Sequence, residues 1–120
     1  MACLYITTDL FFSSRVTSLA RDRQLEVRVV PTVAAAGQLL AEGDFQVAIL
    51  DLTAIKSDLA AAVSQLKQTA PDLHVIAYGP HVDEALLSSA QQAGCDDVMP
   101  RSRFDQEIVS LLAEKMTKSQ

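Results

Sequence analysis

One aspartate, Asp51, is the best placed residue in this sequence to do chemistry. It ends the stretch Val47–Asp51, in which the residues before the carboxylate are all apolar. A short, continuous apolar run is typical of a strand that is buried on both faces of a parallel sheet. In open parallel sheets the ligand crevice lies outside the carboxyl ends of the strands. The sequence therefore predicts that Asp51 belongs to a functional site or to the remnant of one.

A second polar group follows the first apolar stretch of the chain. Thr7, Thr8 and Asp9 separate Cys3–Ile6 from a helical pattern that begins at Leu10. The free N–H groups of a helix N-terminus attract phosphate, so one hypothesis is that the two threonines bind an anion. Local capping is the commoner use of threonine at such a position. We predict that Asp9 is the N-cap residue, with Ser13 as the alternative if the helix starts later.

The other reactive side chains show no arrangement that is typical of a catalytic or metal site. Cys3 and Cys95 lie far apart in the sequence, and neither has metal-ligand spacing or a nearby histidine. His74 and His81 flank a predicted strand without carboxylate or cysteine partners at ligand spacing. No nucleophile–base pair and no glycine-rich phosphate loop is present. We therefore predict that the protein is not an enzyme and holds no metal or cofactor.

Length and composition predict one globular domain. The chain has 120 residues, of which 49% are hydrophobic, and a formal net charge of −5. This acidic balance gives no support to nucleic-acid binding, and no apolar run approaches the roughly 20 residues of a membrane span. No signal peptide is visible, and two isolated cysteines suit a reducing compartment. We expect a single domain over residues 1–120 in the cytoplasm, with no membrane or nucleic-acid partner.

Apolar periodicity and turn residues predict five strands that alternate with five helices. The predicted strands are Cys3–Ile6, Leu25–Val30, Val47–Asp51, Leu73–Tyr78 and Asp97–Met99. The predicted helices are Leu10–Arg23, Val33–Glu42 with Thr32 as its cap, a segment capped by Ser57 or Asp58 and ended by Pro71, Asp83–Ala93, and a last helix that begins with the capping box Ser102–Asp105. A loop is expected from Thr53 to Lys56. This alternation predicts a doubly wound α/β fold with a parallel sheet.

Two stretches resemble the receiver domain of bacterial two-component response regulators. They are Val47–Leu52 and Ala93–Met99, the second of which is similar to the family's Ala-Gly-Ala-Asp-Asp-aromatic stretch. The resemblance extends over essentially the whole chain. It implies a flavodoxin-like (βα)5 fold with a five-stranded sheet of order 2-1-3-4-5 and a site between strands one and three. It also implies that Asp96 and Asp97 form a structural turn rather than a metal dyad.

The resemblance implies a role for several individual positions. In receivers an aspartate after strand three accepts a phosphoryl group from a histidine kinase, and an acidic pair after strand one helps to hold Mg²⁺. A Ser or Thr after strand four and a Lys after strand five contact the phosphate, and an aromatic residue in strand five acts as a switch. In this sequence those positions fall, in order, on Asp51, on Thr7 and Thr8 with Asp9 one place later, on Gly79, on Arg101 and on Val98. Thr53 falls where the family supplies only a backbone carbonyl.

These departures from the family pattern remove most of the charge that the reaction needs. Mg²⁺ prefers carboxylate oxygens, and threonine hydroxyls are neutral. Without the metal, an anionic acceptor would meet an anionic phosphoryl donor. We therefore predict a degenerate pseudo-receiver in which Asp51 is vestigial. Its carboxylate would pair with the guanidinium of Arg101, because the planar fork of arginine suits a carboxylate.

The leading functional hypothesis is a non-catalytic signalling module that acts through protein–protein contacts, with a signalling partner or as a homodimer. The family's usual contact face is formed by the fourth helix, the fifth strand and the fifth helix. Here it would include Ala90, Val98, Met99, Gln106 and Val109. Two alternatives remain open. One is an atypical receiver that a histidine kinase still phosphorylates on Asp51, and the other is a small-ligand-binding domain that uses the same crevice.

Overall fold

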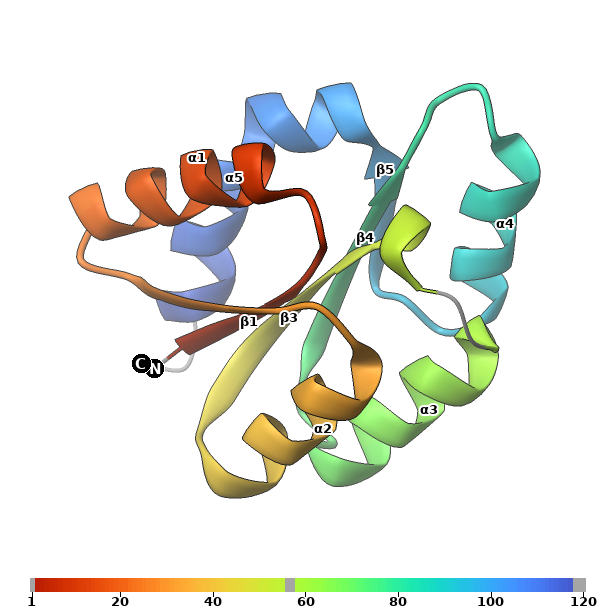
Figure 1. The fold of residues 1–120 in the computed structure, drawn as a ribbon, viewed down its shortest axis with the longest axis horizontal. Helices are drawn as coiled ribbons and strands as arrows, with labels where there is room; N and C mark the ends of the chain where they lie inside the picture. Colours follow the sequence, from red (N-terminus) through yellow and green to blue (C-terminus); the bar gives the residue numbers. More distant parts are fainter. Residues whose placement is uncertain (1, 56–57, 118–120) are drawn as a thin grey trace.

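The computed structural model describes residues 2–55 and 58–117 of the chain. In this part of the chain, five strands alternate with five α-helices, and one short 3₁₀ helix, η1, follows the third strand (Figure 1). The strands are β1 (Ala2–Ile6), β2 (Glu26–Val30), β3 (Phe45–Asp51), β4 (His74–Gly79) and β5 (Asp97–Pro100). The helices are α1 (Leu10–Asp22), α2 (Val33–Glu42), η1 (Leu52–Ala54), α3 (Leu59–Thr69), α4 (Glu84–Gln92) and α5 (Arg101–Thr117).

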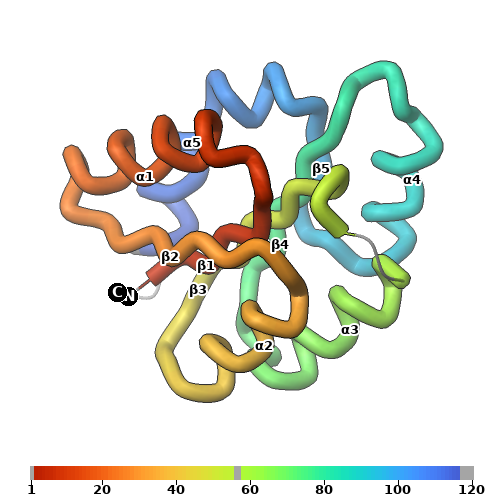
Figure 2. The backbone as a smooth tube through the Cα atoms, in the orientation of Figure 1, coloured from red at the N-terminus to blue at the C-terminus, as the bar shows by residue number. Residues whose placement is uncertain are grey.

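The strands form one parallel sheet in the order β2-β1-β3-β4-β5. Helices α1 and α5 lie side by side on one face of this sheet, and α2, α3 and α4 cover the other (Figure 2). This arrangement confirms the predicted doubly wound, flavodoxin-like α/β fold. It brings the carboxyl ends of β1, β3 and β4 together at one edge, where the site was expected.

Each central strand divides its side chains between two apolar cores. Along β1, Cys3 and Tyr5 pack beneath α1 and α5, whereas Leu4 and Ile6 pack beneath α2, α3 and α4. This alternation is the period-two geometry of a strand. Because both faces are covered, β1 and β3 are almost entirely buried, while the edge strand β2 leaves an exposed side. The prediction that the apolar run before Asp51 is a strand buried on both faces is therefore confirmed.

Polar side chains begin the helices at most of the predicted positions. Asp9 and Thr32 cap α1 and α2 by accepting hydrogen bonds from backbone N–H groups three residues later, at 2.9 and 3.1 Å. Asp58 caps α3 in the same way. Ser57, the other residue considered for this cap, lies outside the described residues. These side chains satisfy N–H groups that a helix start leaves without a partner.

Two local predictions are wrong. Helix α5 begins at Arg101 directly after β5, so Ser102–Asp105 lies inside the helix and is not a capping box. The carboxylate of Asp105 instead accepts a hydrogen bond from Arg15 of α1 at 2.7 Å. The expected loop after β3 contains the helix η1, which Asp51 caps through the N–H of Thr53. Lys56, where this loop was expected to end, lies outside the described residues.

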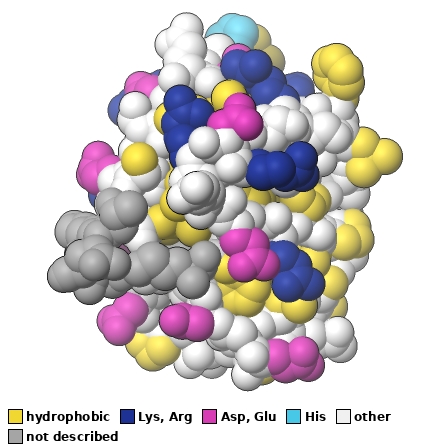
Figure 3. All heavy atoms as spheres, turned by 90° about the vertical axis from the view of Figure 1, so that its left-hand side faces the viewer, with side chains coloured by type: hydrophobic (Ala, Val, Ile, Leu, Met, Phe, Trp, Pro, Cys, Tyr) yellow, Lys and Arg dark blue, Asp and Glu magenta, His cyan; other side chains and the backbone are white. Residues whose placement is uncertain are grey.

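Charge is distributed unevenly over the surface. Residues 9–23 and 101–117, which form α1 and α5 with their flanking turns, carry six basic and five acidic side chains, whereas the other described residues carry two basic and ten acidic ones. In Figure 3 most of the dark blue side chains lie in the upper half of the view, while magenta ones continue to its lower edge. Among the described helices, none is long and apolar enough to cross a bilayer.

The turn between α4 and β5 requires glycine. Gly94 has a φ of +102°, which is strained for residues with a Cβ. We expect Gly94→Ala to lower the free energy of unfolding by about 1–2 kcal/mol. Gly37, inside α2, has no atom within 4 Å of an added Cβ, so Gly37→Ala should raise the free energy of unfolding by about 0.5–1 kcal/mol. Urea unfolding of both variants tests this, and equal effects would contradict it.

Candidate functional site

A cavity of about 200 Å³ opens at the carboxyl edge of the sheet. Its lining residues come from the ends of β3 and β4, from the segments after β1 and β3, and from the start of α5: Thr8, Asp9, Asp51, Thr53, Tyr78, Gly79, Pro80 and Arg101. The structure thus gathers most of the positions that were identified from the resemblance. Val98 is different, because it packs against the core beneath α2, α3 and α4 and does not line the cavity.

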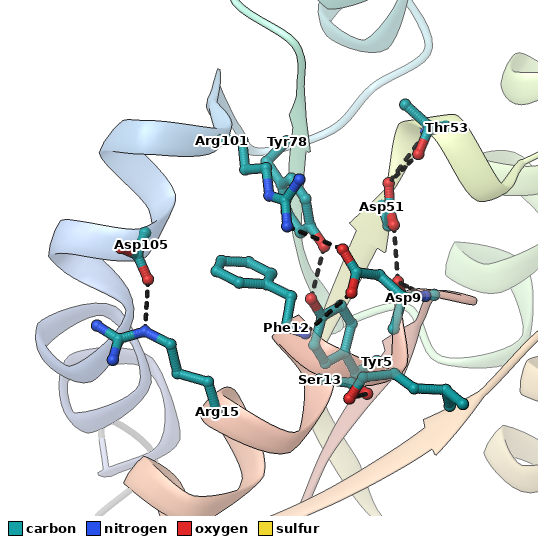
Figure 4. A network of polar contacts seen from close by, with 12 residues as sticks. Tyr5, Asp9, Phe12, Ser13, Arg15, Asp51, Thr53, Tyr78, Arg101 and Asp105 are labelled. Atoms are coloured by element: carbon teal, nitrogen blue, oxygen red, sulfur yellow. Dashed lines mark hydrogen bonds and ion pairs between the residues drawn. The ribbon is translucent and has the colours of Figure 1, made fainter.

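The carboxylate of Asp51 is buried and accepts its hydrogen bonds from neutral groups (Figure 4). One oxygen accepts from the hydroxyl of Thr7 at 2.7 Å. The other oxygen accepts from the hydroxyl of Thr53 at 2.7 Å and from its backbone N–H at 3.1 Å. The resemblance implies only a backbone role for Thr53, whereas its hydroxyl is one of the groups that satisfy this carboxylate. A carboxylate with so little of its surface open to water requires such donors.

The predicted pair of Asp51 with Arg101 is wrong. Arg101 donates to the carboxylate of Asp9 at 2.8 Å, and its guanidinium carbon lies 4.6 Å from the ring centre of Phe12. Asp9 ends the turn before α1 and Arg101 begins α5, so the two helices start beside each other on the same face of the sheet. A single guanidinium can thus bind a carboxylate and stack on a ring. Asp51 already has Thr7 and Thr53 as partners.

Four of the six aromatic residues form a cluster beneath Arg101. Tyr78 stacks on Phe104 of α5 with ring centres 4.4 Å apart, and Phe12 of α1 meets Tyr78 edge to face. The hydroxyl groups of Tyr5 and Tyr78 hydrogen-bond to each other at 2.5 Å. Sequence reasoning missed this cluster. The alternation within each strand predicts which face of the sheet Tyr5 and Tyr78 occupy, but it does not show that α5 packs Phe104 against both rings.

Burial makes both phenols very weak acids. The aromatic cluster keeps water from Tyr5 and Tyr78, which raises the pKa of each well above the usual value for tyrosine. Tyr78 also lines the site cavity, so the floor of the cavity presents a neutral hydroxyl-bearing ring and not an anion. The tyrosine pair therefore acts as a packed polar contact between β1 and β4.

A second polar cluster lies at the opposite edge of the sheet, where β4 and β5 begin. His74 contacts Asp97 at 2.6 Å, so this histidine has a carboxylate partner that its sequence neighbours did not reveal. Asp96 accepts from Lys67 at 2.9 Å and from the N–H of Val75 at 2.8 Å. Burial acts to raise the pKa of Asp96, but these two donors hold it below its usual value. Asp96 thus secures the turn into β5, as the resemblance implied.

The two cysteines are unpaired and differ in burial. Cys3 lies in the core beneath α1 and α5, and burial raises the pKa of its thiol. Cys95 is half-buried, and burial together with the neighbouring Asp96 carboxylate raises the pKa of its thiol to about 11. Both thiols are therefore neutral at physiological pH, whereas a nucleophilic or metal-binding cysteine needs the thiolate.

The site does not fit Mg²⁺, the ion that receivers of the family use. Two carboxylates reach the cavity, and both have hydrogen-bond partners on each oxygen: Asp51 from Thr7 and Thr53, and Asp9 from the N–H of Phe12 and from Arg101. The remaining oxygen donors are hydroxyl groups, which supply no negative charge. Among residues 2–55 and 58–117, no group of three His, Cys, Asp or Glu side chains is arranged to hold a metal ion.

The structure also corrects the expected contact residues on α4, β5 and α5. Ala90 and Met99 are almost completely buried, so they cannot touch a partner. Ala90 packs towards the sheet beneath α4, and Met99 packs beneath α1 and α5. Gln106 is exposed, whereas Val98 and Val109 are half-buried because each also packs against one of the two cores.

Comparison with solved structures identifies the fold. The chain superimposes on the beryllofluoride-activated receiver domain dimer of NtrC4 with a TM-score of 0.77 and 19% identity, over 95% of this chain and 98% of that one. For the NtrX receiver domain from Brucella abortus the TM-score is 0.79 and the identity 19%, over 98% and 99% of the two chains. No family model and no curated sequence matches this chain.

A third similar structure is HP1043, an orphan response regulator of H. pylori. It shares 15% identity with this chain at a TM-score of 0.75, over 100% of this chain and 97% of that one. At identities this low, the likeness establishes the fold. The predicted receiver fold is therefore confirmed.

The tyrosine pair predicts how the domain responds to alkali. The pKa of each buried phenol is raised above its unfolded value, so the stability due to this burial is complete below about pH 10 and is lost at higher pH. The chain has two tyrosines, and both belong to this pair. We expect absorbance at the tyrosinate band to stay flat through pH 10 and to rise only as the far-ultraviolet circular dichroism is lost. The urea-unfolded chain should titrate near pH 10, and a folded chain that does so would contradict the prediction.

The two threonines after β1 provide a matched pair for testing the Asp51 contacts. Thr7→Val removes a buried donor from the carboxylate and should lower the free energy of unfolding by about 1–3 kcal/mol. Thr8 is exposed, so Thr8→Val should change the free energy of unfolding by less than about 0.5 kcal/mol. Chemical denaturation of both variants measures the difference. If the two substitutions are equivalent, the Thr7 hydroxyl does not support Asp51.

Proposed function

We propose that this chain is a non-catalytic, receiver-like signalling module that works through protein–protein contacts and is not phosphorylated in the usual Mg²⁺-dependent way. The observation that carries this proposal is the state of the Asp51 carboxylate, which accepts hydrogen bonds from Thr7 and Thr53 on both oxygens. An attacking carboxylate oxygen needs an approach path and a cation that neutralises the incoming phosphoryl group. Here the groups in direct contact with the carboxylate are two neutral hydroxyls and one backbone N–H.

The other phosphate-contacting positions support the same interpretation. Gly79 has no hydroxyl, although a Cβ there would make ordinary contacts of 3.4–3.5 Å with leucine side chains. Arg101 is bound to Asp9 and stacked over Phe12, so it would have to leave both to reach a phosphate on Asp51. Phosphoryl transfer depends on groups that are positioned before the reaction. Phosphorylation of Asp51 by a histidine kinase remains an alternative function.

Signalling through contacts is supported by the fold and by its similar structures. The NtrC4 receiver is described as a dimer and HP1043 as an orphan response regulator. We assign the α4–β5–α5 face of this chain, with Val98, Gln106 and Val109, to a signalling partner or to a second copy. We also propose that residues 1–120 form one receiver-like domain of the bacterial cytoplasm. The free Cys3 and Cys95 suit a reducing compartment.

A small-ligand-binding function is the second candidate, and the cavity at Asp51 favours it. At about 200 Å³ the cavity is below the usual range for drug-sized ligands, so an occupant would have only a few heavy atoms. Arg101 is the cationic residue in its lining and is already paired with Asp9. A ligand would therefore compete with an existing ion pair, which makes this function the weaker candidate.

Acetyl phosphate provides the direct test of the proposed function. We expect no phosphoryl adduct on Asp51 after incubation with acetyl phosphate and Mg²⁺, measured by intact-protein mass spectrometry at neutral pH. The Burkholderia pseudomallei response regulator whose structure contains a phosphorylated aspartate is the positive control. A mass gain of one phosphoryl group that disappears in Asp51→Asn would overturn the proposal.

A further inference from the structure

A surface groove of about 610 Å³ runs between α1 and α5, on the face of the molecule away from the other helices. It is lined by Phe11, Phe12, Ser14, Arg15, Ser18, Arg101 and Asp105. Phe11 is 92% exposed, and the neighbouring Leu10 is 79% exposed. Both side chains lie at the start of α1, where no described residue covers them. A large exposed aromatic ring beside an open groove is typical of an interaction surface.

The outer stripe of α1 is shaped for close approach of another helix. Phe11, Ser14, Arg15 and Ser18 follow the three- and four-residue spacing of one helix face. The two serines are small and exposed, so they leave room beside the phenylalanine ring. Arg15 reaches across to Asp105 of α5, which places a positive and a negative group next to each other at the groove (Figure 4). The surface therefore combines one apolar anchor, small side chains and both signs of charge.

The charge distribution indicates which partner this surface fits. The whole chain is negative, with ten acidic and two basic side chains on the described residues outside 9–23 and 101–117. Within the α1–α5 layer, six basic and five acidic side chains nearly balance. Two copies of this chain repel each other when their acidic layers meet, because like charges raise the energy of close approach. Contact through the α1–α5 layer instead places the acidic layers at opposite ends of the pair.

A twofold arrangement also satisfies the individual side chains. In an isologous dimer both subunits use the same patch. If one residue contacts a second residue across the axis, the same contact occurs again with the two subunits exchanged. Arg15 and Asp105 can then face the opposite sign across the axis while staying at the groove. We propose that two copies of this chain associate back to back through α1 and α5, with Phe11 of each copy seated in the groove of the other. This face differs from the α4–β5–α5 face of the proposed function, and the dimer does not depend on that proposal.

The dimer would border the Asp51 site. Arg101 lines both the groove and the site cavity, because it begins α5 and leans over Phe12. A second copy on the groove would therefore restrict the movement of Arg101 away from Asp9. Association through this face and a closed Arg101–Asp9 pair would support each other.

Sedimentation equilibrium of the full chain tests the proposal. At low salt and concentrations from about 1 μM to about 1 mM, we expect a monomer–dimer equilibrium with no larger species. Phe11→Glu should raise the dissociation constant about tenfold or more, because it removes the anchor and adds negative charge. Val82→Glu is the matched control, since Val82 is 77% exposed and lies outside the groove, and it should leave the constant nearly unchanged. Circular dichroism checks that both variants fold.

Charge reversal separates this interface from a merely apolar contact. Arg15→Asp should weaken the dimer, and Arg15→Asp combined with Asp105→Arg should restore it, because both signs are again present at the groove. A chain that stays monomeric over the whole range would overturn the proposal. So would a dimer that Phe11→Glu leaves intact but a folded Val98→Glu variant dissociates, since Val98 lies on β5, outside the groove, and that result assigns the contact to the α4–β5–α5 face. Growth into larger species would exclude a closed twofold pair.

Discussion

The burial of one carboxylate governs the arrangement of the site. Asp51 ends a strand that is covered on both faces, so only 5% of its surface is exposed and its charge has little contact with water. Thr7 and Thr53 supply the hydrogen bonds that make this burial tolerable. Thr7 also accepts from the N–H of Asp9, which caps α1, so the carboxylate and the start of that helix share one network. The groups that contact this carboxylate are the two threonine hydroxyls and one backbone N–H.

Aromatic side chains connect the sheet to α5. Tyr78, next in register to Asp51, stacks on Phe104, and Arg101 covers the cluster from the first turn of the helix. The position of the family's switch residue, Val98, packs in the opposite core and has no aromatic ring to move. Aromatic packing thus joins β4 to α5 on the α1 side of the sheet, while Val98 faces the other core.

The two helix layers of the domain differ in charge, and this difference affects association. A domain that works by contact has to present a surface on which a partner can sit without strong repulsion. In this chain the α1–α5 layer has nearly balanced charge and an exposed aromatic anchor, Phe11, whereas the acidic residues concentrate elsewhere. The Asp51 site and the groove meet at Arg101. The cavity at Asp51 and the groove between α1 and α5 are therefore neighbouring surfaces of one small domain.

The sequence by itself determined the element order, the two-sided burial of Val47–Asp51 and the caps at Asp9 and Thr32, because these depend on local spacing and on the period of strands and helices. It also located Asp51, Gly79 and Arg101 at one edge of the sheet. Only the tertiary structure decided that Arg101 binds Asp9, that Thr7 donates to Asp51, and that Phe104 joins Tyr78. The physical reason is that side chains distant in sequence form contacts according to distance and direction, and those follow from how the strands pair and how α1 and α5 pack together.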